Sequence, residues 1–147
     1  MNKIFKLISA GIISLLLTTG VFAQTEVVYI PKNTGNPYFD SIIKGFEVGA
    51  EKYGYNFSTV APATADATSQ LPFIKAEIQR GVDVIAISPN SNDALNTVFD
   101  QARKKGIIIM VVNGDIPGSE AHRDLAIMPV DFSTVCLLYT SDAADES

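Results

Sequence analysis

Short apolar runs recur at nearly even spacing along this chain, and helical patterns fill the intervals between them. Four runs are apolar at almost every position, at residues 27–30, 84–87, 107–112 and 125–130, and a weaker run at residues 55–60 alternates polar and apolar side chains. Continuous apolar runs are typical of parallel strands that helices cover on both faces. The order predicts an α/β fold with a doubly wound parallel sheet, of the Rossmann or flavodoxin kind.

The helical segments between the runs carry start and stop signals. Asn36 is a capping residue placed before a proline at the first helical position, and Gly54 should end that helix. We expect the second helix to begin near residues 68–69 and to end at Gly81. The third helix should run from about residue 93 to residue 105.

The predicted strand order also locates candidate ligand-binding loops. In such a sheet the first strand is usually central, and the second and third strands lie on opposite sides of it. Ligands bind at the switch point between the first and third strands, outside the carboxyl ends of the strands. This rule selects three loops, at residues 32–37, 88–93 and 113–117.

The first 23 residues have the pattern of a secretory signal peptide. Lys3 and Lys6 form a basic start, an apolar run follows at residues 7–17, and Val21 and Ala23 are the small residues that a signal peptidase requires. A transmembrane anchor is the alternative, but the apolar run is shorter than the ~20 residues that span a bilayer. We expect export to the periplasm with cleavage after Ala23.

Charge and composition exclude several classes of function. The net charge is −5, and an acidic chain without a Lys/Arg stripe is a poor candidate for nucleic acid binding. The single His and single Cys exclude a Cys/His metal cluster and a disulfide framework. The sequence contains neither a Gly-rich phosphate fingerprint nor a G-x-S-x-G elbow. We expect neither an enzyme nor a cofactor-binding protein.

The three candidate loops offer amides, carboxylates, one ammonium and aromatic rings, which suit a small polyhydroxylated ligand. Amides and carboxylates exchange pairs of hydrogen bonds with neighbouring hydroxyls, and aromatic rings can cover the C–H face of a sugar. The candidate ligand-binding residues are Lys32, Asn36, Tyr38, Phe39, Asn90, Asn113 and Asp115.

Each of these residues also has a purely structural interpretation. Asn36 can be a helix cap alone, and residues 113–115 form an ordinary turn sequence. Phe39 continues the apolar stripe of the first helix, which favours a core position for its side chain. Tyr38 lies off that stripe, which favours a contact with the ligand.

Three segments give the sequence a family resemblance. They are Ile30-Pro31-Lys32 followed by Gly35-Asn36-Pro37-Tyr38-Phe39, residues 79–88, and residues 105–107 leading to Val112-Asn113-Gly114-Asp115. In order and spacing they resemble the ribose-type periplasmic binding proteins of ABC importers over residues 26–135. The Ile-Pro-Lys opening and the Asn-Gly-Asp turn are most similar to the rhamnose and autoinducer-2 binding branch.

The resemblance implies a two-lobed, monomeric protein that closes on a sugar and presents it to a membrane permease. It implies that Lys32, Asn36, Tyr38 and Phe39 face the ligand. Asn113 stands where ribose-type proteins commonly have an aspartate, and Gly114 stands where they have an arginine. Both differences depart from the pattern of ribose recognition. In these proteins the chain also returns to the first lobe after building the second and covers part of its sheet.

The end of the chain breaks the alternation. Residues 136–147 resemble translated sequencing adaptor, and a natural acidic C-terminus is the alternative. We therefore expect an N-terminal lobe at residues 24–135 whose second lobe is missing. Two other classes compete with the binding protein: the core of a sugar-responsive repressor, which would need a helix-turn-helix where the leader stands, and a flavodoxin-like enzyme or receiver domain.

Overall fold

The computed structural model describes residues 24–91, 93–114 and 118–128. These residues form one parallel sheet in the order β2-β1-β3-β4-β5. The strands are β1 (Glu26–Ile30), β2 (Asn56–Thr59), β3 (Val84–Ile87), β4 (Ile108–Val112) and β5 (Leu125–Ile127). The predicted fold class is confirmed: β1 lies between β2 and β3, and β2, the strand with the weakest sequence signal, lies at one edge.

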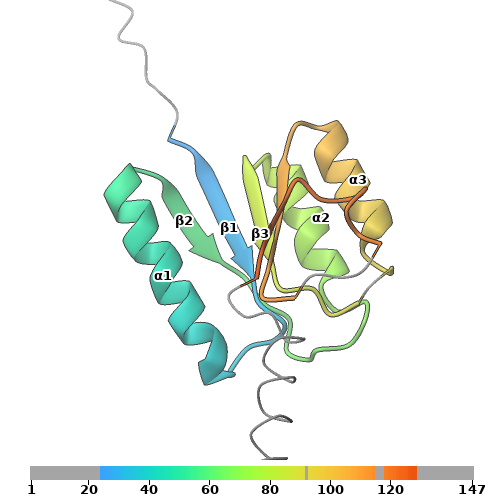
Figure 1. Ribbon diagram of the computed structural model, residues 1–147, viewed down its shortest axis with the longest axis horizontal. Coiled ribbons are helices and arrows are strands. Elements are labelled where there is room, and N and C mark those ends of the chain that lie inside the picture. The colour runs from blue at the N-terminus through green and yellow to red at the C-terminus, as the bar shows by residue number, and fades with distance from the viewer. Residues whose placement is uncertain (1–23, 92, 115–117, 129–147) are drawn as a thin grey trace, which may run out of the picture.

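Helices cover both faces of this sheet, as the continuous apolar runs predicted. Helix α1 (Pro37–Tyr53) lies on one side, while α2 (Leu71–Arg80) and α3 (Asn96–Lys104) lie on the other (Figure 1). Val28 and Ile30 belong to the core beneath α2 and α3, whereas Tyr29 between them belongs to the core beneath α1. Within the described ranges, no helix is long and apolar enough to cross a membrane.

Helix α1 has the ends that the sequence predicts. Asn36 Oδ1 accepts a hydrogen bond of 3.1 Å from the Tyr38 backbone N–H, which satisfies one of the free donors of the first turn. Gly54 ends the helix with φ of +72°, a left-handed conformation in which a side chain would be strained.

The other two helices begin later than predicted because polar turns precede them. Before α2, the Leu71 N–H donates to the Thr68 carbonyl in a turn, so the helix starts at Leu71 rather than at residues 68–69. Before α3, Ser91 Oγ accepts from the Ala94 N–H, and the helix starts at Asn96 rather than near residue 93. Both helices end where the sequence indicates.

The last strand is short and exposed. All three residues of β5 are exposed, and residues 129 and 130, which the sequence assigns to this strand, lie outside the described residues. The proposed leader and the tail from Cys136 lie outside them as well.

On the α1 face, Phe46 stacks on Tyr29 and Phe57, so α1 covers β1 and β2. On the same face Phe39 of α1 covers Ala86 of β3 and Val112 of β4, whereas the rest of β3, β4 and β5 is only partly covered: Val84 and Met110 are half-buried, and Ile108 and Ile127 are exposed.

Candidate functional site

The three loops selected from the sequence lie at one end of the sheet. Because β1, β3 and β4 are parallel neighbours, their carboxyl ends meet at the same edge. Of the predicted site residues, Asp115 falls in the gap at residues 115–117 and lies outside the described residues. The other six can be placed.

Tyr38 and Asn113 come together across this edge. The phenol O–H of Tyr38 donates a hydrogen bond of 2.6 Å to Oδ1 of Asn113. Asn113 adopts a left-handed conformation with φ of 57°, which asparagine tolerates better than most residues. Its N–H donates to the Ile127 carbonyl, which extends the pairing of β4 and β5. The side-chain amide of Asn113 is therefore held beside an exposed aromatic ring, at the edge formed by the carboxyl ends of β1, β3 and β4, which is where doubly wound sheets have their ligand crevice and which we call the crevice.

Tyr38 and Phe39 have opposite environments, as the helical stripe predicted. Phe39 is buried, with 4% of its surface exposed, and packs against Tyr29, Ala86 and Val112. Tyr38 is 53% exposed, and its ring meets the Phe39 ring edge to face at 5.3 Å. The core position of Phe39 is confirmed, and its contact with a ligand stays a prediction.

Two of the predicted amides are engaged within the protein. Asn36 caps α1, so the structural interpretation of this residue is confirmed while a ligand contact stays a prediction. Asn90 Nδ2 donates to the Lys32 carbonyl at 2.8 Å and to Ser69 Oγ at 3.2 Å. Asn90 Oδ1 is buried and has no hydrogen-bond partner among the described residues. Asn90 thus fastens the backbone of the first loop to the second.

A chain of buried hydroxyl groups, not anticipated from the sequence, joins the three strands beneath the crevice. Ser88 Oγ donates to the Val112 carbonyl at 2.8 Å, so the Tyr29 O–H, also 2.8 Å away, is the donor to Ser88. Burial, which removes water from the phenolate, raises the pKa of Tyr29 to about 12, although the Ser88 hydrogen bond partly opposes the shift. Tyr29 is accordingly a neutral structural donor.

Gln70 is a second buried polar residue that the sequence analysis did not select. Its side chain is fully buried and spans from the turn before α2 to the first and second loops. Nε2 donates to the Pro31 carbonyl at 3.0 Å and to the Ser88 carbonyl at 2.9 Å, and Oε1 accepts from the Asn90 N–H at 2.9 Å. A lone glutamine beside a predicted helix start carries no sequence signal of such a role.

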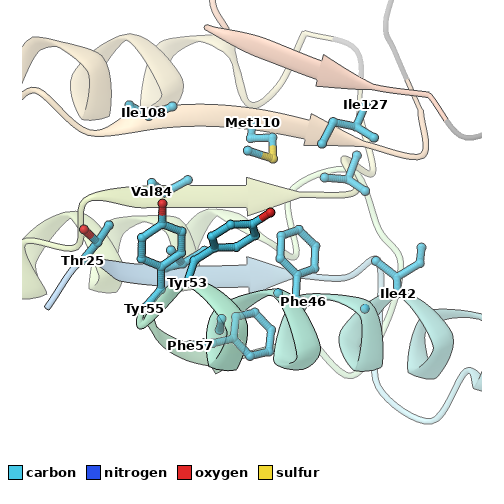
Figure 2. Close-up of a pocket in the computed structure, with 15 residues that line it drawn as sticks. Thr25, Ile42, Phe46, Tyr53, Tyr55, Phe57, Val84, Ile108, Met110 and Ile127 are labelled. Carbon is cyan, nitrogen blue, oxygen red and sulfur yellow. The ribbon is translucent and has the colours of Figure 1, made fainter.

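A wide apolar hollow lies away from these loops. It is a groove of about 620 Å³ on the α1 face, between α1 and strands β3, β4 and β5 (Figure 2). Ile42, Phe46 and Tyr53 of α1 face it from one side, and strand residues such as Met110 and Ile127 line the other. Such an apolar lining lacks the polar partners that sugar hydroxyls require. The groove therefore suits a packing partner better than a sugar.

The arrangement at the crevice is chemically that of a binding site. The described residues include no group of three or more His, Cys, Asp or Glu that could hold a metal ion. The side chains brought to the edge are neutral amides and an aromatic phenol, set on a rigid sheet. Such groups hold and orient a hydroxylated ligand by hydrogen bonds and ring contact. An α/β lobe with polar loops at its switch point defines a ligand-binding domain.

Comparison with known families assigns this domain. The model of the periplasmic binding protein domain matches residues 27–135. The chain therefore belongs to the periplasmic binding protein family, and membership implies a location in the periplasm.

Curated and solved relatives agree with this assignment. The D-allose-binding periplasmic protein of Escherichia coli is 32% identical over 111 residues, which are 75% of this chain and 36% of the relative. The structure of a sugar ABC transporter from Actinomyces odontolyticus is 30% identical with a TM-score of 0.75, and the match covers 82% of this chain and 38% of that one. LsrB from Clostridium saccharobutylicum in complex with AI-2 is 27% identical with a TM-score of 0.64, over 69% of this chain and 31% of that one.

This chain thus spans less than half the length of each of these relatives. Their names describe binding and transport, which agrees with the expectation that the chain is not an enzyme. They do not favour the repressor alternative.

Proposed function

We propose that this chain is the first lobe of a two-lobed periplasmic protein that binds a monosaccharide and delivers it to the permease of an ABC importer. The hydrogen bond between Tyr38 and Asn113 carries the proposal on the structural side. It brings an aromatic ring and a side-chain amide, from loops after different strands, to the edge where doubly wound sheets bind ligands. The complete protein is expected to act as a monomer.

The ligand contacts follow from the positions of these groups. Tyr38 presents its ring to the C–H face of the sugar, and Asn113 exchanges hydrogen bonds with the hydroxyls. Lys32 and Asp115 add charged groups from the same loops. The side chains of Asn36 and Asn90 would bond the sugar through the polar atoms that make no hydrogen bond within the protein. The second lobe would supply the opposite wall of the site and exclude water on closure.

We further propose a ligand of the rhamnose or autoinducer-2 kind rather than ribose. The amide of Asn113 replaces a carboxylate, and Gly114 replaces an arginine, of the ribose-type pattern. Among the relatives, one structure holds AI-2, and one protein is named for D-allose. D-allose is therefore the competing ligand.

The test is isothermal titration of the complete two-lobed protein with L-rhamnose, AI-2, D-allose and D-ribose. We expect one ligand of the first two to bind with a micromolar constant, about −8 kcal/mol, and ribose to bind much more weakly. Tight binding of D-allose alone would overturn the ligand assignment and keep the function. Failure of all four to bind would contradict the monosaccharide function.

We also propose that the leader is removed after Ala23. The first strand begins at Glu26, so cleavage there leaves every described residue in the mature protein. The intact mass of the exported product should correspond to a chain that begins at Gln24 or Thr25. A product that retains Met1 or stays integral to the membrane would contradict this assignment.

A further inference from the structure

Gln70 occupies a position that no ligand can reach and that no helix cap requires. It directly precedes α2, but its side chain makes no capping bond to that helix. Its exposed fraction is zero. A buried polar side chain is costly unless its hydrogen-bonding groups are paired, so the partners of Gln70 indicate its role.

Those partners lie in the two loops that flank the switch point. Both N–H groups of the carboxamide are used, one on the Pro31 carbonyl after β1 and one on the Ser88 carbonyl after β3. The carbonyl oxygen accepts from the Asn90 N–H in the second of these loops. One planar group thereby fixes the distance between the backbones of two loops.

A second set of contacts extends this link to the rest of the crevice. Asn90, whose N–H is held by Gln70, donates through Nδ2 to the Lys32 carbonyl. Ser88, whose carbonyl is held by Gln70, donates through Oγ to the Val112 carbonyl, directly before Asn113. The three loops at the crevice are therefore connected through one buried side chain and its immediate partners.

We propose that Gln70 is a positioning residue of the sugar site, whose buried carboxamide sets the spacing between the loop after β1 and the loop after β3. This inference rests on the proposed sugar-binding function. Glutamine suits the position because it provides two donors and one acceptor in a plane. An ionised glutamate provides no donor, and methionine, of similar shape, provides no strong hydrogen-bonding group.

The test compares Gln70→Glu with the matched control Gln79→Glu in the complete protein. Gln79 is an exposed residue in the last turn of α2, so the control makes the same chemical change near the other end of this helix, away from the loops. L-rhamnose, AI-2, D-allose and D-ribose are each titrated from about pH 5 to about pH 8, at temperatures where circular dichroism shows both variants folded. Wild type is the reference at each pH, because other charged groups such as Lys32 and Asp40 lie near these loops.

We expect the affinity of Gln70→Glu for the wild-type ligand to fall by about tenfold or more at the upper pH. Burial and the two facing carbonyl oxygens favour the protonated form of the introduced carboxyl, which can donate one hydrogen bond. Binding should therefore recover partly as the pH falls, while wild type and Gln79→Glu keep a common profile. A merely structural role would change the unfolding transition without changing the affinity of the folded protein.

Gln70→Met keeps the proposal testable if the charged variant does not fold. It should bind at least about tenfold more weakly than wild type, with no recovery at low pH. Wild-type affinity in either folded variant would overturn the role of Gln70 while leaving the sugar function intact. A wild-type protein that binds none of the four ligands contradicts both the proposed binding function and the role assigned to Gln70 within it.

Discussion

The phenol of Tyr38 donates a hydrogen bond of 2.6 Å to the side-chain carbonyl of Asn113, which lies 75 residues further along the chain. The bond links the first turn of α1 to the loop after β4 across the carboxyl ends of β1 and β3. In the absence of a sugar it satisfies two groups that we assign to the ligand. A bound sugar would have to share or replace it.

Truncation of the two adjacent aromatic residues should have opposite effects. Tyr38→Ala is expected to weaken sugar binding with little change in the free energy of unfolding, because the side chain is 53% exposed. Phe39→Ala should destabilise the fold by about 3–5 kcal/mol, as truncation of a buried phenylalanine typically does. Denaturant melts and calorimetry on the complete protein measure both quantities.

Tyr38→Phe is the matched control, because it keeps the ring and removes only the hydrogen bond to Asn113. Affinity close to wild type in this variant would assign the contribution of Tyr38 to ring contact. If Tyr38→Ala lowers stability more than Phe39→Ala, the assignment of core and site is wrong.

Replacement of Asn113 should separate the ligand role from the backbone role. Asn113→Gly keeps the left-handed conformation at φ of 57° without strain and removes the amide. We expect this variant to fold normally and to lose on the order of 1–3 kcal/mol of binding free energy for each lost buried hydrogen bond.

Asn113→Ala should also lower the free energy of unfolding, by at most about 1–2 kcal/mol, because alanine lacks the short polar side chain with which asparagine tolerates the left-handed conformation. Calorimetry and thermal melts on both variants distinguish the two effects. An unchanged dissociation constant in Asn113→Gly would identify Asn113 as a turn residue alone.

The buried phenol of Tyr29 should make the protein sensitive to alkali. Its pKa is raised from 10.0 to about 12, so the unfolded chain loses this proton at a lower pH than the folded protein. Stability should therefore be constant below about pH 10 and fall as the pH rises toward 12, by a total on the order of 2–3 kcal/mol from this group.

Tyr29→Phe should lower stability at neutral pH, because Ser88 loses its donor, but should remove this part of the decline in alkali. Guanidinium melts at a series of pH values give the two slopes. Parallel pH profiles for wild type and variant would show that Tyr29 does not contribute.

The regular part of this fold was predictable because its signals are local. Continuous apolar runs such as residues 84–87 identified buried strands, and Gly54 identified a helix end, from a few neighbouring residues. The distinction between Tyr38 and Phe39 also followed from local periodicity. Each of these features depends on residues that are near in sequence.

The hydrogen-bond network beneath the crevice was not predictable in the same way. Gln70 meets Pro31 39 residues away and Ser88 18 residues away, and a polar residue before a helix has many possible partners. The late start of α3 likewise depends on the Ser91 hydroxyl, which competes with the helix for a backbone N–H. Such competition is decided by three-dimensional neighbours rather than by propensity.

The 147-residue chain by itself should neither bind sugar usefully nor behave as a stable monomer. The apolar groove on the α1 face exposes residues such as Ile108 and Ile127, which we expect later parts of a complete protein to cover. Exposed apolar surface and an open strand edge favour association. One lobe with half the contacts would also reduce a micromolar site to about millimolar binding.

Size-exclusion chromatography and titration of the purified 147-residue chain with the four candidate sugars test this expectation. We expect broad or high-mass elution and no measurable heat of binding. A sharp monomeric peak with micromolar sugar affinity would show that one lobe suffices as a receptor.

The pairing of the first strand with β3 has a consequence for the order of events during folding. The start of β1 is tied to the segment before β3 through Glu26 and Asp83, which are 57 residues apart, and parallel strands cannot pair through a short hairpin. Contacts of such long range slow folding, so we expect refolding on the order of milliseconds to seconds. A newly made chain then stays unfolded until β3 has been synthesised and for some time afterwards. If the proposed leader directs export of an unfolded chain, this interval would assist it, and a stopped-flow refolding rate in the microsecond range would contradict this kinetic advantage.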